Sequence, residues 1–260
     1  MNTMTRTGTT PALASAWHQA LRPYCAELVA ELRRAWRTPA FAVPSLLFPV
    51  LFYLLFGVLL GRGHAPLYLL ATYCVFGAMA PALFGFGVQL ALDREGGLLT
   101  LKRALPIPAA APLLARLAMA VMFALLVASL LIGAAHVLGG VRLQALQVLQ
   151  LMAVAGLAAL PLGAIGLLIG SHVSASAAPA MVNLVYLPLA LLSGLWLPLS
   201  ALPVLFSTMA PLWPTWHLAQ LALPVVGLPS AGSIGGHLLV LLAVTAVALL
   251  LARRRLRRIG

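Results

Sequence analysis

The chain has 260 residues, of which 63% are hydrophobic and only 8% are charged. A soluble domain carries about 25% charged residues, so this composition excludes an ordinary soluble protein. A formal net charge of +12 is typical of nucleic-acid-binding proteins, but here the basic residues flank long apolar runs. Basic residues in that position act as topology signals and contact anionic lipid headgroups. We therefore expect a protein that crosses a membrane several times, with membrane lipids and no nucleic acid among its partners.

The first 15 residues are polar and rich in threonine, and we expect them to form a disordered tail. Residues 16–37 differ, because their apolar side chains recur at three- and four-residue steps on one helical face. A basic amphipathic helix of this kind lies along the membrane surface, and Glu31 can pair with Arg34 one turn on. Two interpretations stay open: a lipid anchor, and an interfacial helix that also contacts a partner. The apolar positions are Leu21, Tyr24, Cys25, Leu28, Leu32, Ala35 and Trp36.

Six later segments are apolar over about the 20 residues that a helix needs to cross a bilayer. The sequence therefore predicts an all-α polytopic membrane protein in which residues 16–260 form a single transmembrane domain. The predicted spans are residues 41–60, 67–92, 113–138, 145–170, 178–197 and 234–252.

Between the fifth and sixth spans, residues 196–229 are divided by six prolines into short apolar pieces. Pieces this short cannot cross a bilayer, so we expect short re-entrant or interfacial helices buried against the bundle. In the fourth span, Gly166 and Gly170 form a GxxxG pair. We interpret this pair as ordinary close packing between helices rather than as a dimer contact.

The basic residues are distributed very unevenly over the two sides that six spans would create. An even number of spans puts both termini on one side, and that side would hold 14 of the 16 basic residues. Only Arg62 and Arg142 would lie opposite. Because basic loops stay in the cytoplasm, we expect both termini there, in a bacterial inner membrane.

The residues that could perform chemistry are few. The acidic residues are Glu27, Glu31, Asp93 and Glu95, and none lies in a predicted span, which argues against a proton relay or an intramembrane protease. A phosphate-binding loop reads GxxxxGK[ST], whereas the sole lysine, Lys102, is followed by Arg103. The chain is therefore expected to hold no cofactor and to draw energy from another polypeptide.

A few polar side chains lie within the predicted spans. Gln89, Gln147 and Asn183 are candidates for lining a substrate path. The plainer interpretation is hydrogen bonding between helices, worth roughly 0.6–2 kcal/mol each, and it is favoured for any single one of them. A path this apolar suits a hydrophobic or amphipathic cargo better than a small ion.

Three stretches, in this order, resemble the permease subunits of type-2 ATP-binding-cassette exporters, the ABC-2 transporter family. Arg37-Thr38-Pro39 leads into AFAVPSLLFPVLFYLLFG, which resembles the family's first span. The stretch DREGGLLTLKRALPIP, residues 93–108, resembles the loop after the second span. Residues 193–220 resemble its outer re-entrant region. One departure is an extra residue within residues 95–100.

The resemblance implies a concrete assembly. Two permeases pair, as a homodimer or a heterodimer, and each docks on a cytoplasmic ATPase subunit that binds ATP and magnesium. Residues 93–112 form a coupling loop that fits a cleft in the ATPase, and residues 16–37 act as a connecting helix. The residues assigned to coupling are Arg94, Glu95, Gly96, Thr100, Lys102, Arg103 and Pro106.

The resulting hypothesis is a non-catalytic permease subunit that exports a hydrophobic or amphipathic small molecule or a lipid-like cargo. Two alternatives stay open, a membrane scaffold or accessory subunit outside the ABC class, and a secondary transporter. The identity of the cargo is not encoded in these patterns.

Overall fold

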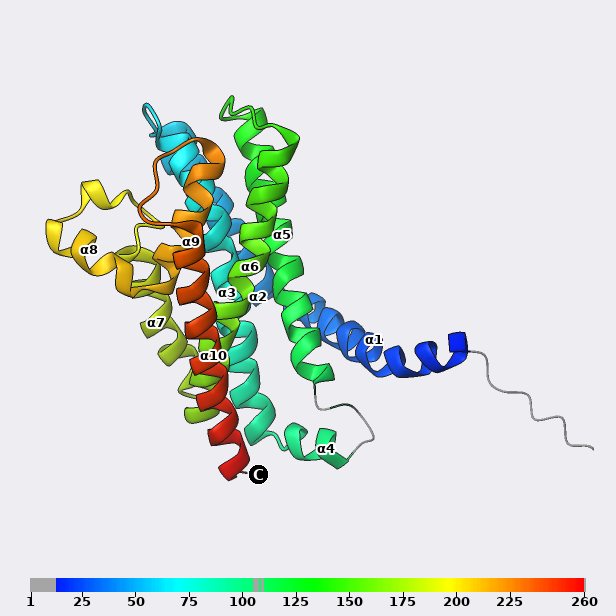
Figure 1. Ribbon diagram of the computed structural model, residues 1–260. Coiled ribbons are helices and arrows are strands. Elements are labelled where there is room, and N and C mark those ends of the chain that lie inside the picture. Colours follow the sequence, from blue (N-terminus) through cyan, green and yellow to red (C-terminus); the bar gives the residue numbers. More distant parts are fainter. Residues whose placement is uncertain (1–12, 105–107, 109, 260) are drawn as a thin grey trace, which may run out of the picture.

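The computed structural model describes residues 13–104, 108 and 110–259, and every regular element in these residues is a helix. The expected tail thus lies mostly outside the described residues, but its last three positions already belong to the first helix, α1 (Leu13–Arg37). Helix α1 projects sideways from a bundle formed by the long helices (Figure 1). The all-α fold class is confirmed.

Five helices in the described residues are long and apolar enough to cross a membrane. The fifth predicted span is the exception, because α7 (Ala178–Leu192) has 15 residues and ends before Ser193 and Gly194, where the backbone turns with φ +78°. The six-span count therefore stays a prediction. The long elements are α2 (Pro39–Phe52), continued by the π-helix η1 (Tyr53–Leu59), α3 (Ala65–Glu95), α5 (Ala111–Val137), α6 (Ala145–His172) and α10 (Ile234–Ile259).

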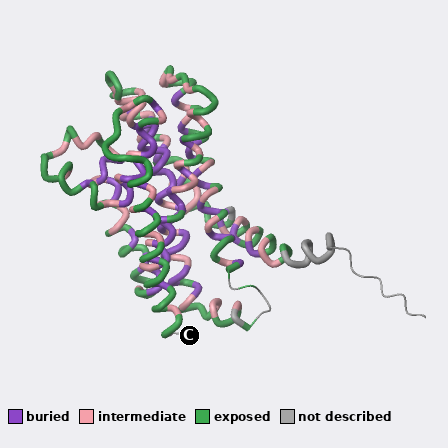
Figure 2. The backbone as a smooth tube through the Cα atoms, viewed as in Figure 1, coloured by how far each residue is buried: buried purple, intermediate pink, exposed green. Residues whose placement is uncertain are grey.

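The centre of the bundle is α3, whose residues are buried on all sides over most of its length (Figure 2). Its main partner is α6, and glycines let the two backbones approach closely. A Cβ atom added to Gly166 would lie 2.7 Å from the carbonyl oxygen of Leu83, and Gly170 faces Gly87 in the same way. The GxxxG pair therefore packs within the chain, which confirms its interpretation as close packing.

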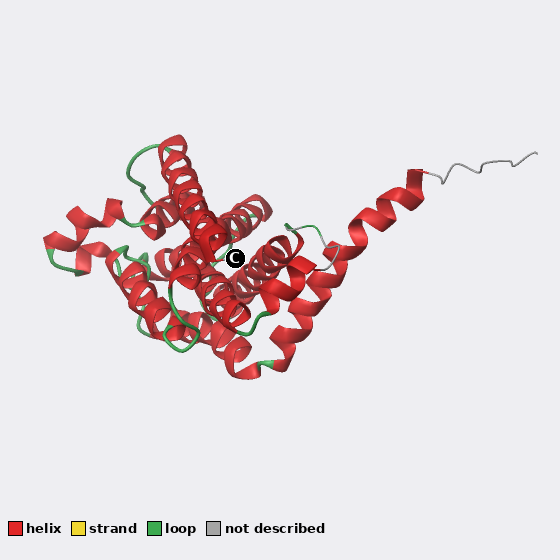
Figure 3. Ribbon diagram, turned by 90° about the horizontal axis from the view of Figure 1, so that it is seen from below, coloured by secondary structure: helices red, strands yellow, loops and turns green. Residues whose placement is uncertain are grey.

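Helices α3, α6 and α10 end at the same end of the bundle, lowest in Figure 1, and Figure 3 looks at the molecule from that side. We call it the basic end, because Arg94 and the arginines of α10 lie there. The opposite end, the far end, carries the short turns after η1 and α5.

Between α7 and α10 the chain forms a series of short helices, as the proline spacing predicts. Of these, α9 is buried against α3, α6 and α10, whereas α8 is exposed. Whether the series re-enters a bilayer stays a prediction. The helices are η2 (Leu199–Ala201), α8 (Val204–Met209), η3 (Ala210–Leu212), α9 (Pro214–Ala222) and η4 (Leu223–Val226).

A buried histidine pair fastens α9 to the start of α10. The Nδ1 atoms of His217 and His237 lie 2.8 Å apart, and the two Nε2 atoms face the carbonyl oxygens of Pro211 and Ala231. A carbonyl only accepts, so an Nε2–H can donate to its carbonyl, and which Nδ1 donates to the other depends on the tautomer of each ring. Burial lowers the pKa of His217, the neighbouring His237 lowers it further, and the hydrogen bond to Pro211 opposes this.

We predict that replacing Gly166 with Ala destabilises the protein by about 1–3 kcal/mol, because the methyl group would force α3 and α6 apart. Gly133→Ala is the matched control, since nothing lies within 4 Å of a Cβ atom there. Thermal unfolding in detergent measures both variants. Equal melting temperatures for the two would contradict the close packing of α3 on α6.

We also predict that acid weakens the contact between α9 and α10. The pKa of His217 is lowered on folding, so the unfolded chain binds more protons, and the contribution present above about pH 6.5 is lost as the pH falls. Protonation of His217 would place a positive charge in this buried site, and all four carboxylates of the chain lie elsewhere, on α1 and at the end of α3.

Melting temperatures at pH 7.5 and pH 5.5 test this effect. The wild type should lose stability at the lower pH, His217→Gln should lose much less, and His136→Gln, an exposed histidine at the far end, should behave like the wild type. A wild type that melts alike at both pH values would contradict this account of the pair.

Candidate functional site

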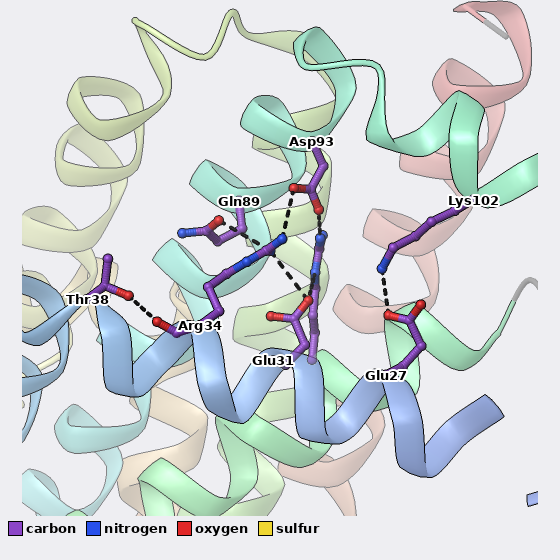
Figure 4. Close-up of polar contacts among 8 residues, drawn as sticks. Glu27, Glu31, Arg34, Thr38, Gln89, Asp93 and Lys102 are labelled. Carbon is purple, nitrogen blue, oxygen red and sulfur yellow. Dashed lines mark hydrogen bonds and ion pairs between the residues drawn. The ribbon is translucent and has the colours of Figure 1, made fainter. Parts of the chain in front are cut away.

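A cluster of charged side chains lies at the basic end, where α1, α3, α5 and the short helix α4 (Leu98–Ala104) meet (Figure 4). It contains Glu27, Glu31 and Asp93, three of the four acidic residues of the chain, and each is less than 10% exposed. We call this cluster the charged junction. Its members, from all four helices, are Glu27, Glu31, Arg34, Asp93, Lys102 and Arg116.

The centre of the charged junction is Arg116 in α5, whose side chain is 3% exposed. Its Nε atom donates to Oε1 of Glu31 on α1 at 3.3 Å, and its Nη2 atom donates to Oδ2 of Asp93 on α3. Removing one partner from a buried ion pair leaves an uncompensated charge and is strongly destabilising. The guanidinium therefore holds α1, α3 and α5 in one arrangement.

Arg34, on α1, is the second arginine of the charged junction. Its guanidinium lies 3.5 Å from both Glu31 and Asp93, and it donates to Oε1 of Gln89 on α3 at 3.5 Å. The expected pairing of Glu31 with Arg34 is thus confirmed. Three carboxylates face three cations in the junction, so its formal charges balance.

Lys102 connects α4 to this junction. Its Nζ atom donates to Oε2 of Glu27 on α1 at 2.6 Å, and its side chain is 18% exposed. The lysine expected to face an ATPase thus points toward α1. As a result, α4 is attached to α1 by an ion pair and, through α1, to α3 and α5.

Arg94, at the end of α3, also turns inward. Its guanidinium donates to the carbonyl oxygens of Gly170, Ser171 and Val173, at the carboxyl end of α6. The last carbonyls of a helix lack partners in their own helix and carry partial negative charge, so a cation there is stabilising. Arg94 therefore caps α6.

The other expected coupling residues form the outer surface of the turn. Glu95 is about half exposed and lies 4.0 Å from Arg94, while Gly96 and Thr100 are exposed. The left-handed φ of +72° at Gly97 lets the chain turn from α3 into α4. The side chain of Arg103 and all of Pro106 lie outside the described residues.

Sequence reasoning missed one residue on this surface. Leu101 is 58% exposed, whereas Leu99 packs on the core. A large apolar side chain that faces outward from a polar turn is typical of a contact surface. The run of leucines on α4 indicated that this helix has apolar surface, but the sequence alone does not show which leucine points outward.

The three candidate path residues are not brought together. Gln89 accepts from Arg34 in the charged junction, and Gln147 donates to the carbonyl oxygen of Val225 at 2.8 Å. The Gln147 side chain also accepts from the backbone of Gln144 and so caps α6 at the far end. Asn183 lines a cavity of about 410 Å³, and Gln89 lines a smaller one of about 180 Å³ beside Arg34.

That cavity, of about 410 Å³, lies between α2, α3 and α7. Its walls are mainly aromatic, and Phe52 stacks on Trp196 with ring centres 6.4 Å apart. Asn183 and Ser45 are the polar side chains on it. We call it the aromatic cavity, and its other aromatic walls are Phe41, Phe48, Phe76, Phe84 and Tyr186.

A sequence profile of the family described as "ABC-2 type transporter" matches residues 24–226, from α1 to the end of η4. The chain belongs to this family. The ABC-2 resemblance predicted from the sequence is thus confirmed. A relative named "Putative transport permease YvfS", from Bacillus subtilis (strain 168), is 24% identical over 233 residues, which cover 86% of this chain and 93% of the relative.

Membership of the ABC-2 family, together with the long apolar helices, identifies the chain as a multi-pass membrane transport subunit. Membership of the ABC-2 family implies an ATPase partner in an ABC system. The charged junction and α4 both lie within the matched residues.

We predict that Arg116→Gln costs about 3–5 kcal/mol of stability, because it leaves Glu31 and Asp93 buried without their shared cation. Arg142→Gln is the matched control, an exposed arginine at the far end that makes no ion pair in the described residues. Thermal unfolding and the yield of monodisperse protein in detergent measure both. If both variants melted alike, Arg116 would not hold the helices together.

Proposed function

We propose that this ABC-2 permease is the membrane subunit of an exporter that moves a hydrophobic or amphipathic cargo outward, using ATP hydrolysed by a separate subunit. The observation that carries the proposal is the attachment of α4. This short helix is exposed at Leu101 and Thr100, yet the ion pair of Lys102 with Glu27 joins it to the spans. A helix that exposes one face, and is held to the protein by an ion pair on its other face, is suited to receive motion from a docked partner.

The docking surface that we propose consists of Glu95, Thr100 and Leu101, and the family resemblance adds Arg103, whose side chain lies outside the described residues. Arg94 and Lys102 take a different part, because their charges are engaged by α6 and α1. They transmit movement within the permease and do not bind the ATPase. The ATPase subunit would hold the ATP and the magnesium ion.

The orientation in the membrane follows from the distribution of charge. Basic loops remain in the cytoplasm, so we place the basic end, both termini and α4 on the cytoplasmic side of a bacterial inner membrane. The short helices from η2 to η4 then belong to the outer half. Leu21 and Cys25 on α1 are exposed, which suits a helix that rests on the inner surface of the bilayer.

We assign the cargo to the aromatic cavity. Apolar walls with a few polar groups are typical of sites for small amphipathic molecules, and Asn183 supplies such a group. The cavity is bordered by side chains that this chain leaves exposed, among them Phe48 at 55% and Leu187 at 48%. A second permease copy or a paralogue would cover this side and complete the path.

Co-purification tests the proposed partner. An ABC ATPase should be retained by the tagged full chain, and Glu95→Ala combined with Arg103→Ala should reduce its retention about tenfold or more, because charge-assisted contacts are lost. Leu101→Ser should weaken it as well. Arg62→Ala combined with Arg142→Ala, at the far end, is the control and should have no effect.

The alternatives give different results in the same experiment. A scaffold subunit would retain no ATPase at all, and a secondary transporter would transport under an ion gradient without nucleotide. Unchanged ATPase retention and unchanged hydrolysis in the double variant of the turn would contradict the proposed docking surface.

A further inference from the structure

The arginines at the end of α10 have no counter-charge within the described residues. Five arginines lie between Arg253 and Arg258, and none of them takes part in an ion pair there. Like charges one helical turn apart repel each other, so such a cluster favours the arrival of an anion.

Three of these arginines share one face of α10. Arg254, Arg255 and Arg258 follow Leu251 at steps of three, four and seven residues, which places all four side chains on one helical face. That face meets the end of α6, and with Leu168 and His172 it lines a cavity of about 380 Å³. We call this cavity the cationic groove.

The acidic side chains of the chain do not supply the missing negative charge. Glu27, Glu31 and Asp93 are engaged in the charged junction, and Glu95 lies against Arg94. The carbonyl groups at the end of α6 carry partial negative charge, but the guanidinium of Arg94 already occupies them. We therefore look to another molecule for the counter-charge of the cationic groove.

The shape of the groove indicates what that molecule is. Arginine guanidinium groups bind phosphate through paired hydrogen bonds, and three of them converge here with a histidine. Leu168 lies one turn before the histidine on α6, and Leu251 lies one turn before the arginines on α10. Both helices are long and apolar enough to cross a membrane, so the apolar part of the groove lies toward the bilayer. A cationic rim above an apolar wall fits an anionic head joined to hydrocarbon.

We propose that the cationic groove binds the headgroup of an anionic phospholipid. The phosphate lies against Arg254, Arg255 and Arg258, and an acyl chain lies along Leu168 and Leu251. A free phosphate ion would satisfy the arginines but would leave the apolar wall without a partner. The site is independent of the aromatic cavity and of the ATPase docking surface.

Native mass spectrometry of the full chain in detergent, titrated with phosphatidylglycerol, tests the site. Arg254→Gln with Arg258→Gln removes two arginines of the groove, and Arg62→Gln with Arg142→Gln, at the far end, is the matched control with the same change in charge. We expect the groove variant to lose on the order of tenfold more affinity than the control, because direct phosphate contacts exceed diffuse surface attraction. We expect phosphatidylcholine, which has no net charge, to bind weakly to all three proteins.

Four results would overturn the proposal. Equal losses in the two variants would reduce the effect to general surface charge, and equal binding of phosphatidylcholine would remove the role of the anionic head. Displacement of the lipid by inorganic phosphate at similar concentration would make this a free-anion site. A groove variant that binds lipid normally but fails to retain the ATPase would assign the arginines to a protein contact.

Discussion

The burial of Arg116 between Glu31 and Asp93 is the constraint on which the arrangement of this permease depends. A guanidinium removed from water is costly unless charged partners surround it, and these partners come from α1 and α3. Helix α1, which projects sideways from the bundle, therefore has a fixed position relative to the spans. The ion pair of Glu27 with Lys102 extends the same network to α4.

The bundle divides into a rigid part and a less buried part. Glycines let α3 and α6 pack backbone to backbone, and Arg94 locks the end of α6 to α3. In contrast, α2 has two interior prolines, Pro44 and Pro49, continues into a π-helix, and leaves much of its surface exposed. An interior proline removes a backbone hydrogen bond, and in α2 little packing compensates for the loss, so movement is easiest there. The aromatic cavity lies between these two parts, where such movement would change its shape.

Much of the fold could be predicted because hydrocarbon thickness imposes a length on every span. The predicted boundaries of α3, α5 and α6 lie within about three residues of those observed. The end of α7 could not be predicted, since apolar residues continue past Ser193 while the backbone turns at Gly194. Hydropathy records which residues are apolar but not where a helix ends within an apolar stretch.

The candidate site was predicted in its location but not in its geometry. Polar residues after the second span marked the turn, yet the sequence gives no sign that Lys102 pairs with a residue 75 positions away. Periodicity placed Glu27 off the apolar face of α1, and it could not reveal that this carboxylate would be buried by distant cations. Such pairings depend on the fold as a whole.

We propose that the ion pair between α1 and α4 transmits the motion of the ATPase into the spans. Exchange of the two charges tests it most directly, by measuring ATP hydrolysis and cargo-dependent stimulation in the complete complex reconstituted in lipid. We predict that Glu27→Lys and Lys102→Glu each abolish the stimulation while the ATPase remains bound, and that the double exchange restores it. A double variant as defective as the single ones, or single variants with full stimulation, would contradict the account.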